Sequence, residues 1–146
     1  MNKTQSKGNS LELKCITKFI ELGYECSIPY GNSALYDFIV DIRGKLIKIQ
    51  CKNSLYSYQS GRRCRDEGSF QIPTSRQTTN TKRTVRYTYH KSEIDYFMTL
   101  FNEKFYLIPV EECHTAKILR LTPPKNNIKN YNKAENYLLE TVLLKL

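Results

Sequence analysis

Three polar residues, Asp37, Gln50 and Lys52, are of types that can hold a divalent cation beside a phosphate group. Mg²⁺ is usually bound by one or two carboxylates together with waters and substrate oxygens, and an amide oxygen can serve as a further ligand. A lysine beside such a site can neutralise charge on the phosphate. Because Gln50 and Lys52 are two positions apart, they project from the same face if they lie on a strand. Whether these residues can bind a cation together then depends on whether Asp37 lies next to Gln50 and Lys52.

The elements that must bring these residues together are two strands within residues 36–53, where apolar and polar residues alternate on both sides of residues 43–44. Alternation is typical of half-buried strands, and a glycine-containing break between two such runs predicts a hairpin. With a two-residue turn, Asp37 lies opposite Gln50, and opposed side chains have Cβ atoms about 5 Å apart. The same register places Ile42 opposite Lys45, Val40 opposite Ile47 and Phe38 opposite Ile49.

Two alternatives to this arrangement remain open from the hairpin alone. A three-residue turn without a bulge would send Asp37 and Gln50 to opposite faces, because a slip of one residue reverses every side chain. The polar face of the hairpin could also be simple solvated surface. Asp41 shares that face, but it lies two pleats away, so we expect it to be outside the immediate contacts of the site.

Residues 6–22 predict a helix that ends at Gly23. Glu12 lies on the same face as the apolar residues of this helix. A carboxylate on an inward face is costly to bury unless it meets a cation, a metal or hydrogen-bond donors. The alternative is a partly exposed glutamate near the helix start that complements the helix dipole. The apolar stripe consists of Cys15, Ile16, Phe19 and Ile20, and the candidate N-caps are Ser6, Asn9 and Ser10.

The length of 146 residues and the 40% hydrophobic content indicate one globular domain, spanning residues 1–146. No apolar run approaches the ~20 residues that cross a bilayer, and the polar first ten residues do not resemble a signal peptide. We therefore expect a cytoplasmic protein without a membrane partner. Five scattered cysteines without a C-x-x-C pair indicate reduced thiols rather than a zinc site.

Positive charge is concentrated in residues 54–91. The chain has 23 basic and 14 acidic residues, a net charge of +9, and this segment contributes +6 because it holds eight basic residues and two acidic ones. This distribution favours a polyanionic partner, and the arginine, glutamine and asparagine side chains suit DNA phosphates and base edges. A solvated basic loop is the alternative. The residues predicted to contact DNA are Arg62, Arg63, Arg65, Gln71, Arg76, Lys82, Arg83 and Arg86.

The rest of the chain predicts mostly strands. Residues 94–109 are the most apolar stretch and predict two buried strands, 96–100 and 104–108, although a helix over the first half is an alternative. Residues after Asn130 predict a C-terminal helix. Shorter strands are predicted at 24–28, 70–72, 84–89 and 117–121. The two histidines, expected to be structural or solvent-exposed, are His90 and His114.

Five short motifs, taken in order, resemble the PD-(D/E)xK nuclease superfamily, and most closely its group I intron-associated homing endonucleases. They are GNSLE with Glu12, GYECSIPYG, LYDFIVD with Asp37, KIQCK with Gln50 and Lys52, and IDYF…FYLIP. The resemblance implies an α/β, restriction-endonuclease-like core with a central mixed β-sheet flanked by helices and a long basic DNA-binding insertion. Two positions depart from the family pattern. Tyr36 stands where a proline precedes the aspartate, and Gln50 replaces the Asp or Glu before x-Lys, as is known in the homing branch.

The resemblance also implies the roles of the site residues. Asp37 would be the principal metal ligand, with Gln50 Oε1 and the backbone carbonyl of Cys51 completing the site. Glu12 would hold the metal directly or through water. Lys52 would orient the attacking water or neutralise developing charge on the phosphate. The implied cofactor is Mg²⁺, with Mn²⁺ as a substitute, and no small-molecule cofactor is expected.

The implied function is Mg²⁺-dependent, site-specific hydrolysis of phosphodiester bonds in double-stranded DNA. A chain of this length reads only a few base pairs, so a long target implies a homodimer or homotetramer on a pseudo-palindromic site. Three other interpretations remain open. They are a structure-selective nuclease of the Holliday junction resolvase type, a non-catalytic DNA-binding module, and an RNA-processing nuclease, for which Tyr87 and Tyr89 are the only hint.

Overall fold

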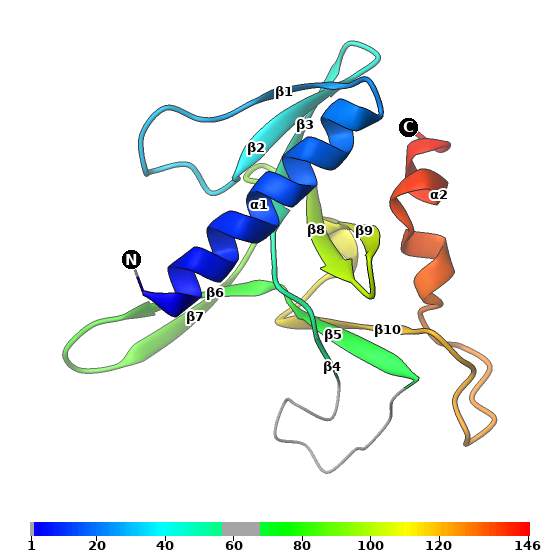
Figure 1. Cartoon of the computed structure of the whole chain (residues 1–146). Coiled ribbons are helices and arrows are strands. Elements are labelled where there is room, and N and C mark those ends of the chain that lie inside the picture. Colours follow the sequence, from blue (N-terminus) through cyan, green and yellow to red (C-terminus); the bar gives the residue numbers. More distant parts are fainter. Residues whose placement is uncertain (1, 57–67) are drawn as a thin grey trace.

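A five-stranded mixed sheet forms the centre of the computed structural model, which describes residues 2–56 and 68–146. The strand order is β1-β2-β3-β8-β9; β3 and β8 run parallel, and the other neighbours are antiparallel (Figure 1). The mixed sheet and the two strands predicted in the apolar stretch are confirmed. The strands are β1 Glu25–Ser27, β2 Phe38–Ile42, β3 Lys45–Cys51, β8 Tyr96–Phe101 and β9 Lys104–Pro109.

The hairpin of β2 and β3 has the register that the sequence predicts. Phe38 pairs with Ile49 and Ile42 with Lys45. Arg43 and Gly44 both have positive φ, 55° and 84°, as a two-residue primed turn requires. Asp41 Oδ1 accepts a hydrogen bond from the backbone N–H of Gly44 at 2.7 Å, so this carboxylate stabilises the turn.

Helix α1, Lys3–Glu21, begins three residues earlier than predicted. Asn2 caps it rather than Ser6, Asn9 or Ser10, through a reciprocal pair of hydrogen bonds between Asn2 and Gln5. The predicted end is confirmed, since Gly23 follows with φ of 88°. Ile20 was predicted to face inward, but its surface is 58% exposed. The buried residues of α1 are Leu11, Cys15, Ile16 and Phe19.

Two hydrophobic cores lie against the central sheet. The first core joins α1, the β2–β3 hairpin and the short C-terminal helix α2, Leu139–Leu143. The second core joins the other side of β8 and β9 to a three-stranded sheet of order β10-β5-β4. Strand β8 serves both, because Met98 lies in the first core and Phe97 in the second. These strands are β4 Leu55–Tyr56, β5 Ser69–Pro73 and β10 Ala116–Arg120.

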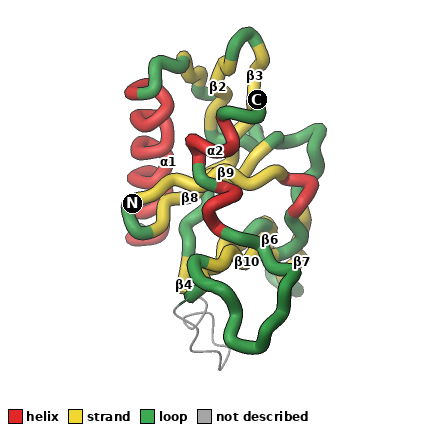
Figure 2. The backbone as a smooth tube through the Cα atoms, turned by 90° about the vertical axis from the view of Figure 1, so that its right-hand side faces the viewer, coloured by secondary structure: helices red, strands yellow, loops and turns green. Residues whose placement is uncertain are grey.

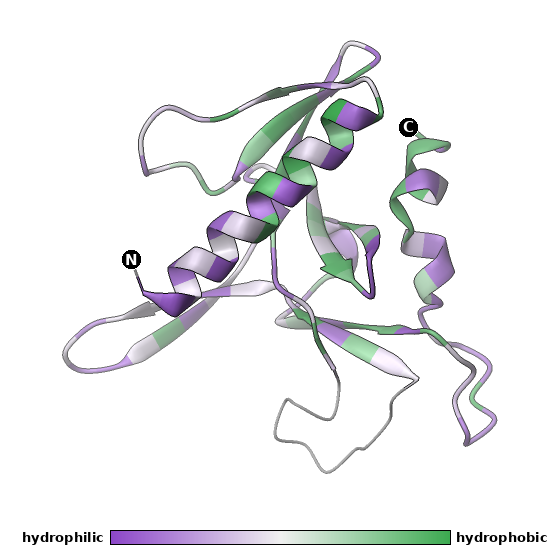
Figure 3. Ribbon diagram, viewed as in Figure 1, coloured by the Kyte–Doolittle hydropathy of each residue, from purple (hydrophilic) through white to green (hydrophobic). Residues whose placement is uncertain are grey.

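The pictures show these layers directly. Figure 2 shows α1 as a separate layer beside the strands. Figure 3 shows hydrophobic and hydrophilic residues alternating along α1, while β2, β3 and β8 are largely hydrophobic. The helix is therefore amphipathic, as a helix that covers one face of a sheet should be.

The C-terminal segment is less helical than predicted. A 3-10 helix, η3 Ala134–Tyr137, precedes α2, and Leu138 between them has ψ of 138°. Leu138 also forms an isolated bridge with Tyr106, which explains why one continuous helix does not form. The helical turn after Pro109 is present as η2, Val110–Glu112.

The basic segment 54–91 contains more regular structure than the sequence indicates. Strands β6 Ser75–Thr79 and β7 Thr84–Thr88 form a separate two-stranded antiparallel ribbon. The ribbon extends away from the body of the molecule at the lower left of Figure 1. Strand β6 was not predicted, because its residues are polar and lack an apolar alternation.

The structure also bears on membrane-spanning segments and on the cysteines. No helix among residues 2–56 and 68–146 has the length and apolar content of a membrane span. The thiols of Cys15, Cys26, Cys51 and Cys113 are free, and Cys64 lies outside the described residues.

Candidate active site

Asp37 sits immediately before β2, and the end of β3 holds its carboxylate. Its backbone N–H donates to the carbonyl of Ile49 at 2.8 Å. Its Oδ2 atom accepts hydrogen bonds from the backbone N–H of Cys51 at 2.7 Å and from Gln50 Nε2 at 3.0 Å. The predicted juxtaposition of Asp37 and Gln50 is therefore confirmed.

Burial raises the pKa of Asp37, although the hydrogen bond from Cys51 and the charge of Lys52 act in the opposite direction. Glu12, on α1, is half-buried, and its pKa is raised by burial and by the negative charge of Asp37. Two carboxylates from elements far apart in sequence thus lie within electrostatic range of one another. Their repulsion is the kind that a bound cation relieves.

Gln50 acts as a hydrogen-bond donor to Asp37 through its side-chain amide nitrogen. Its Nε2 faces Asp37 and also donates to the carbonyl of Cys51 at 3.4 Å. The predicted use of Gln50 Oε1 as a ligand would require the amide to turn. The thiol of Cys51 points into the first core, where a hydrogen bond with Cys15 and burial raise its pKa far above the usual value. Both the backbone N–H and the thiol of Cys51 interact with Asp37, and each of these hydrogen bonds lowers the pKa of the carboxyl group.

Lys52 directly follows the end of β3 and lies near Asp37. Its Nζ donates to the carbonyl of Ser75 at 3.2 Å and lies 5.1 Å from the centroid of the Tyr89 ring. Burial lowers the pKa of Lys52, and the charge of Asp37 partly offsets that effect. The ammonium is therefore half-buried beside a carboxylate, which is the setting in which a lysine is most easily tuned for catalysis.

Sequence analysis missed the residues that surround Lys52. Tyr89 packs edge-on against Phe97, with ring centroids 5.2 Å apart and an angle of 90° between the ring planes. Burial raises the pKa of Tyr89, with a smaller contribution from the charge of Asp37. No spacing signal could have found this contact, because the ribbon must fold before Ser75 and Tyr89 meet Lys52.

The donor set fits Mg²⁺ better than zinc. Among residues 2–56 and 68–146 there is no cluster of three or more His, Cys, Asp or Glu side chains arranged to hold a metal. Zinc sites need three or four such ligands. Mg²⁺ needs only one or two carboxylates, because waters and phosphate oxygens complete its shell. Asp37 and Glu12 supply that number.

The ribbon carries half of the predicted DNA contacts. Lys82 and Arg83 are exposed in its turn, where Asn80 Oδ1 accepts hydrogen bonds from both of their backbone N–H groups. Arg86 on β7 is exposed, and one of its Nη atoms lies 2.8 Å from the side-chain amide of Gln77. The ribbon has no acidic residue between positions 75 and 89, so its charge is uniformly positive.

Arg76 lies at the base of the ribbon. One of its Nη atoms is 3.9 Å from Glu93, and its guanidinium lies 5.2 Å from the centroid of the Tyr87 ring. Its Nε is buried and has no hydrogen-bond partner among the described residues. Gln71, in contrast, lies on β5 in the three-stranded sheet. Three predicted contacts, Arg62, Arg63 and Arg65, lie outside the described residues.

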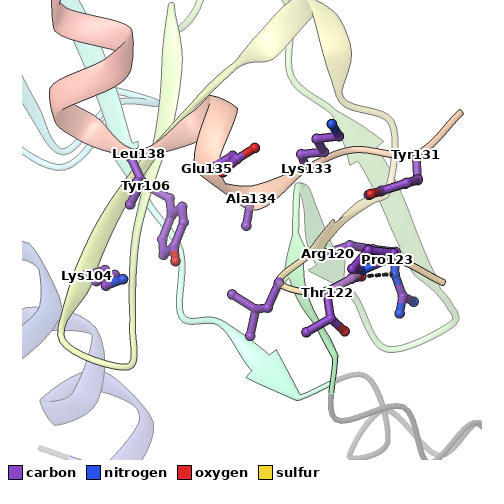
Figure 4. A pocket seen from close by; sticks show the side chains of 11 residues that line it. Lys104, Tyr106, Arg120, Thr122, Pro123, Tyr131, Lys133, Ala134, Glu135 and Leu138 are labelled. Atoms are coloured by element: carbon purple, nitrogen blue, oxygen red, sulfur yellow. Dashed lines mark hydrogen bonds between the residues drawn. The ribbon is translucent and has the colours of Figure 1, made fainter. Parts of the chain in front are cut away.

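A separate pocket of about 440 Å³ opens between β9, β10 and the segment before η3 (Figure 4). Lys104, Arg120 and Lys133 line it together with one acidic residue, Glu135. None of the candidate active-site residues lines this pocket. The candidate active site is therefore separate from this pocket.

Comparison with known proteins agrees with this geometry. The family model described as PD-(D/E)XK endonuclease matches residues 2–140. The chain is also similar to the solved structure of a bacterial homing endonuclease, I-Ssp6803I, with a TM-score of 0.75 and 22% sequence identity over 99% of this chain and 95% of that one. No curated protein matches the chain. At that identity the solved structure establishes the shared restriction-endonuclease-like fold, and the family model, which covers nearly the whole chain, establishes that this protein belongs to the PD-(D/E)XK endonucleases.

Proposed function

We propose that the protein is a Mg²⁺-dependent, site-specific endonuclease that hydrolyses phosphodiester bonds in double-stranded DNA, acting in the manner of a homing enzyme. The observation that carries this proposal is the meeting of Asp37, Gln50 and Lys52 at the base of a positively charged ribbon. The similarity to a homing endonuclease structure supports the same conclusion.

The carboxylates of Asp37 and Glu12 would hold the metal, together with the Cys51 carbonyl and, after rotation of its amide, Gln50 Oε1. Bound there, Mg²⁺ would supply positive charge to the phosphate and lower the pKa of a coordinated water. Mn²⁺ would substitute, because it favours the same oxygen ligands.

Lys52 would act on the substrate directly. Its ammonium lies beside Asp37, so it would sit next to a phosphate brought to the carboxylates. From there it would neutralise developing negative charge on the phosphate and orient the attacking water. Its lowered pKa eases proton exchange with that water.

The ribbon would bind DNA. A two-stranded β-ribbon fits the major groove of B-DNA, and its arginine and lysine side chains would contact phosphates and guanine edges. Exposed Lys82, Arg83 and Arg86 are suited to this role. Arg76, nearer to Lys52, would contact a phosphate close to the cleaved bond. Two or four copies of the chain on a pseudo-palindromic target would double the number of bases that are read.

The decisive experiment is incubation of the purified protein with a randomised DNA library and Mg²⁺, followed by sequencing of the cut ends. Recovery of one recurrent, pseudo-palindromic sequence is expected. The variants D37N and K52M should bind that sequence but not cleave it. Normal cleavage by both variants would refute the assignment of the site.

The same assay separates the other interpretations. Cleavage of four-way junctions irrespective of sequence would identify a junction-selective nuclease. Binding without cleavage at any Mg²⁺ concentration would identify a non-catalytic module. RNA processing is the less favoured interpretation, because the rings of Tyr87 and Tyr89 already face Arg76 and Lys52, and only Tyr87 of the two is exposed.

A further inference from the structure

The ammonium of Lys52 is held by the two ends of the β6–β7 ribbon. Its hydrogen-bond acceptor is the carbonyl of Ser75, the first residue of β6. The ring beneath it belongs to Tyr89, the residue after the end of β7. Ser75 pairs with Thr88 across the ribbon, so the two contacts are adjacent at its base.

Lys52 has no salt bridge within 4 Å among the described residues, so these two are the direct contacts of its ammonium, and the charge of Asp37 acts on it from further away. A carbonyl on one side and an aromatic face on the other restrict a flexible ammonium far more than either does alone. Its conformation is therefore set by a segment 23 to 37 positions further along the chain.

Tyr89 is itself fixed to the central sheet. Its ring meets the fully buried Phe97 at a right angle. Phe97 lies on β8 and pairs with Gln50 on β3. The tyrosine thus connects β8, the neighbour of the strand that carries Gln50, to the ribbon that extends into solvent. The charges of Asp37, Arg76 and Glu93 all act on it.

We propose that Tyr89 is a positioning residue for Lys52, and that it and the Ser75 carbonyl couple the seating of the β6–β7 ribbon on DNA to the placement of the catalytic ammonium. This inference rests on the proposed nuclease function. A ribbon that seats fully in a groove holds both contacts in place. A ribbon displaced by a mismatched sequence shifts the carbonyl and the ring together, and Lys52 moves with them.

The test compares Y89L, Y89F and K52M on the DNA site recovered from the randomised library. Y89L keeps apolar bulk but removes the ring, so its single-turnover cleavage rate should fall about tenfold, the effect of one such contact. Its affinity for the site and the Mg²⁺ concentration for half-maximal rate should not change, because neither the ribbon's basic residues nor the carboxylates are altered. Y89F keeps the ring and should retain the rate.

A second measurement does not depend on cleavage. In protein labelled with ¹³C-lysine, the Lys52 methylene signals, identified by their loss in K52M, should be shifted upfield by the ring. The shift should persist in Y89F and disappear in Y89L. If Y89L does not fold, the wild-type spectrum decides alone, and a Lys52 signal coincident with those of exposed lysines overturns the proposal.

The outcomes distinguish a failure of the positioning role of Tyr89 from a failure of the proposed nuclease function. If K52M is inactive but Y89L cleaves as wild type does, the positioning role of Tyr89 is refuted and the nuclease assignment stands. If Y89L loses affinity and rate in equal measure, Tyr89 is part of DNA binding instead, and the proposal also fails. If K52M cleaves normally, the proposed function itself is wrong, whatever the tyrosine variants do.

Discussion

Gln50 Nε2 donates a hydrogen bond to Asp37 Oδ2 at 3.0 Å, so the residue that replaces the family's second carboxylate stabilises the first one. A glutamate at this position would instead place two negative charges together. The glutamine therefore lowers the electrostatic cost of the site before any cation binds. Glu12, on another element, is the carboxylate whose charge interacts with that of Asp37, and in the proposed site it would be the second carboxylate ligand.

The variant Q50E should depend more strongly on metal for its stability. Loss of the hydrogen bond and repulsion with Asp37 should cost about 1–3 kcal/mol in EDTA. Added Mg²⁺ should raise the melting temperature of Q50E more than that of wild type, because binding to the native state stabilises it by mass action. Thermal melts with and without Mg²⁺ measure both effects. Equal Mg²⁺-induced shifts in the two proteins would show that position 50 does not contribute to the metal site.

The contribution of Asp37 to the stability of the metal-free protein should fall as pH rises through the acid range. Because the pKa of Asp37 is raised above 3.8 in the folded state, the folded state binds more protons there than the unfolded state. The contribution of this group is therefore complete below pH 3.8 and is lost as pH rises through its folded-state pKa. D37N should flatten this part of the profile in EDTA. Thermal melts across the acid range give the comparison, and a wild-type profile that rises with pH and is unchanged in D37N would contradict it.

The ribbon turn should contribute to DNA affinity in a salt-dependent way. The double variant K82A/R83A removes two exposed charges, so the slope of log K against log salt should decrease by about 1.8, roughly 0.9 for each phosphate contact. Fluorescence anisotropy at several salt concentrations measures the slope. The matched control is K125A/K145A, which removes two exposed lysines outside the ribbon and should have a smaller effect. Equal effects of the two pairs would indicate nonspecific charge.

The second core should be essential to folding. Phe70 is fully buried and stacks on Phe101 with ring centroids 4.2 Å apart, so F70A should lower the free energy of unfolding by about 3–5 kcal/mol. Ile118, on the neighbouring β10, is 44% exposed, and I118A should cost less than about 1 kcal/mol. Urea unfolding of both variants provides the test. Similar losses would mean that the two cores are not organised as described.

The sequence was sufficient for the parts of the site that depend on local patterns. Alternation and the 43–44 turn determine the hairpin register, and with it the contact between Asp37 and Gln50. The position of Glu12 on the inward side of α1 follows from helical spacing. Ile20 was assigned wrongly because the helical stripe is wider in the sequence than the contact that the sheet provides.

The surroundings of Lys52 could not be predicted in the same way. They depend on a ribbon whose first strand, β6, has no apolar periodicity and forms only by pairing with β7. The contact of Lys52 with Ser75 uses a backbone carbonyl, for which residue identity gives no signal. The break at Leu138 was equally hidden, because it results from a bridge to Tyr106 on a distant strand.

The outer half of the ribbon lies outside both hydrophobic cores. Residues 77 to 84, in the outer half of the ribbon, are all exposed. Substitutions there disturb neither core, and they leave untouched the hairpin that carries Asp37 and Gln50. If the ribbon reads DNA as proposed, mutations that alter which sequence is read would therefore be nearly free of folding cost, and the target could change while the catalytic residues stay the same.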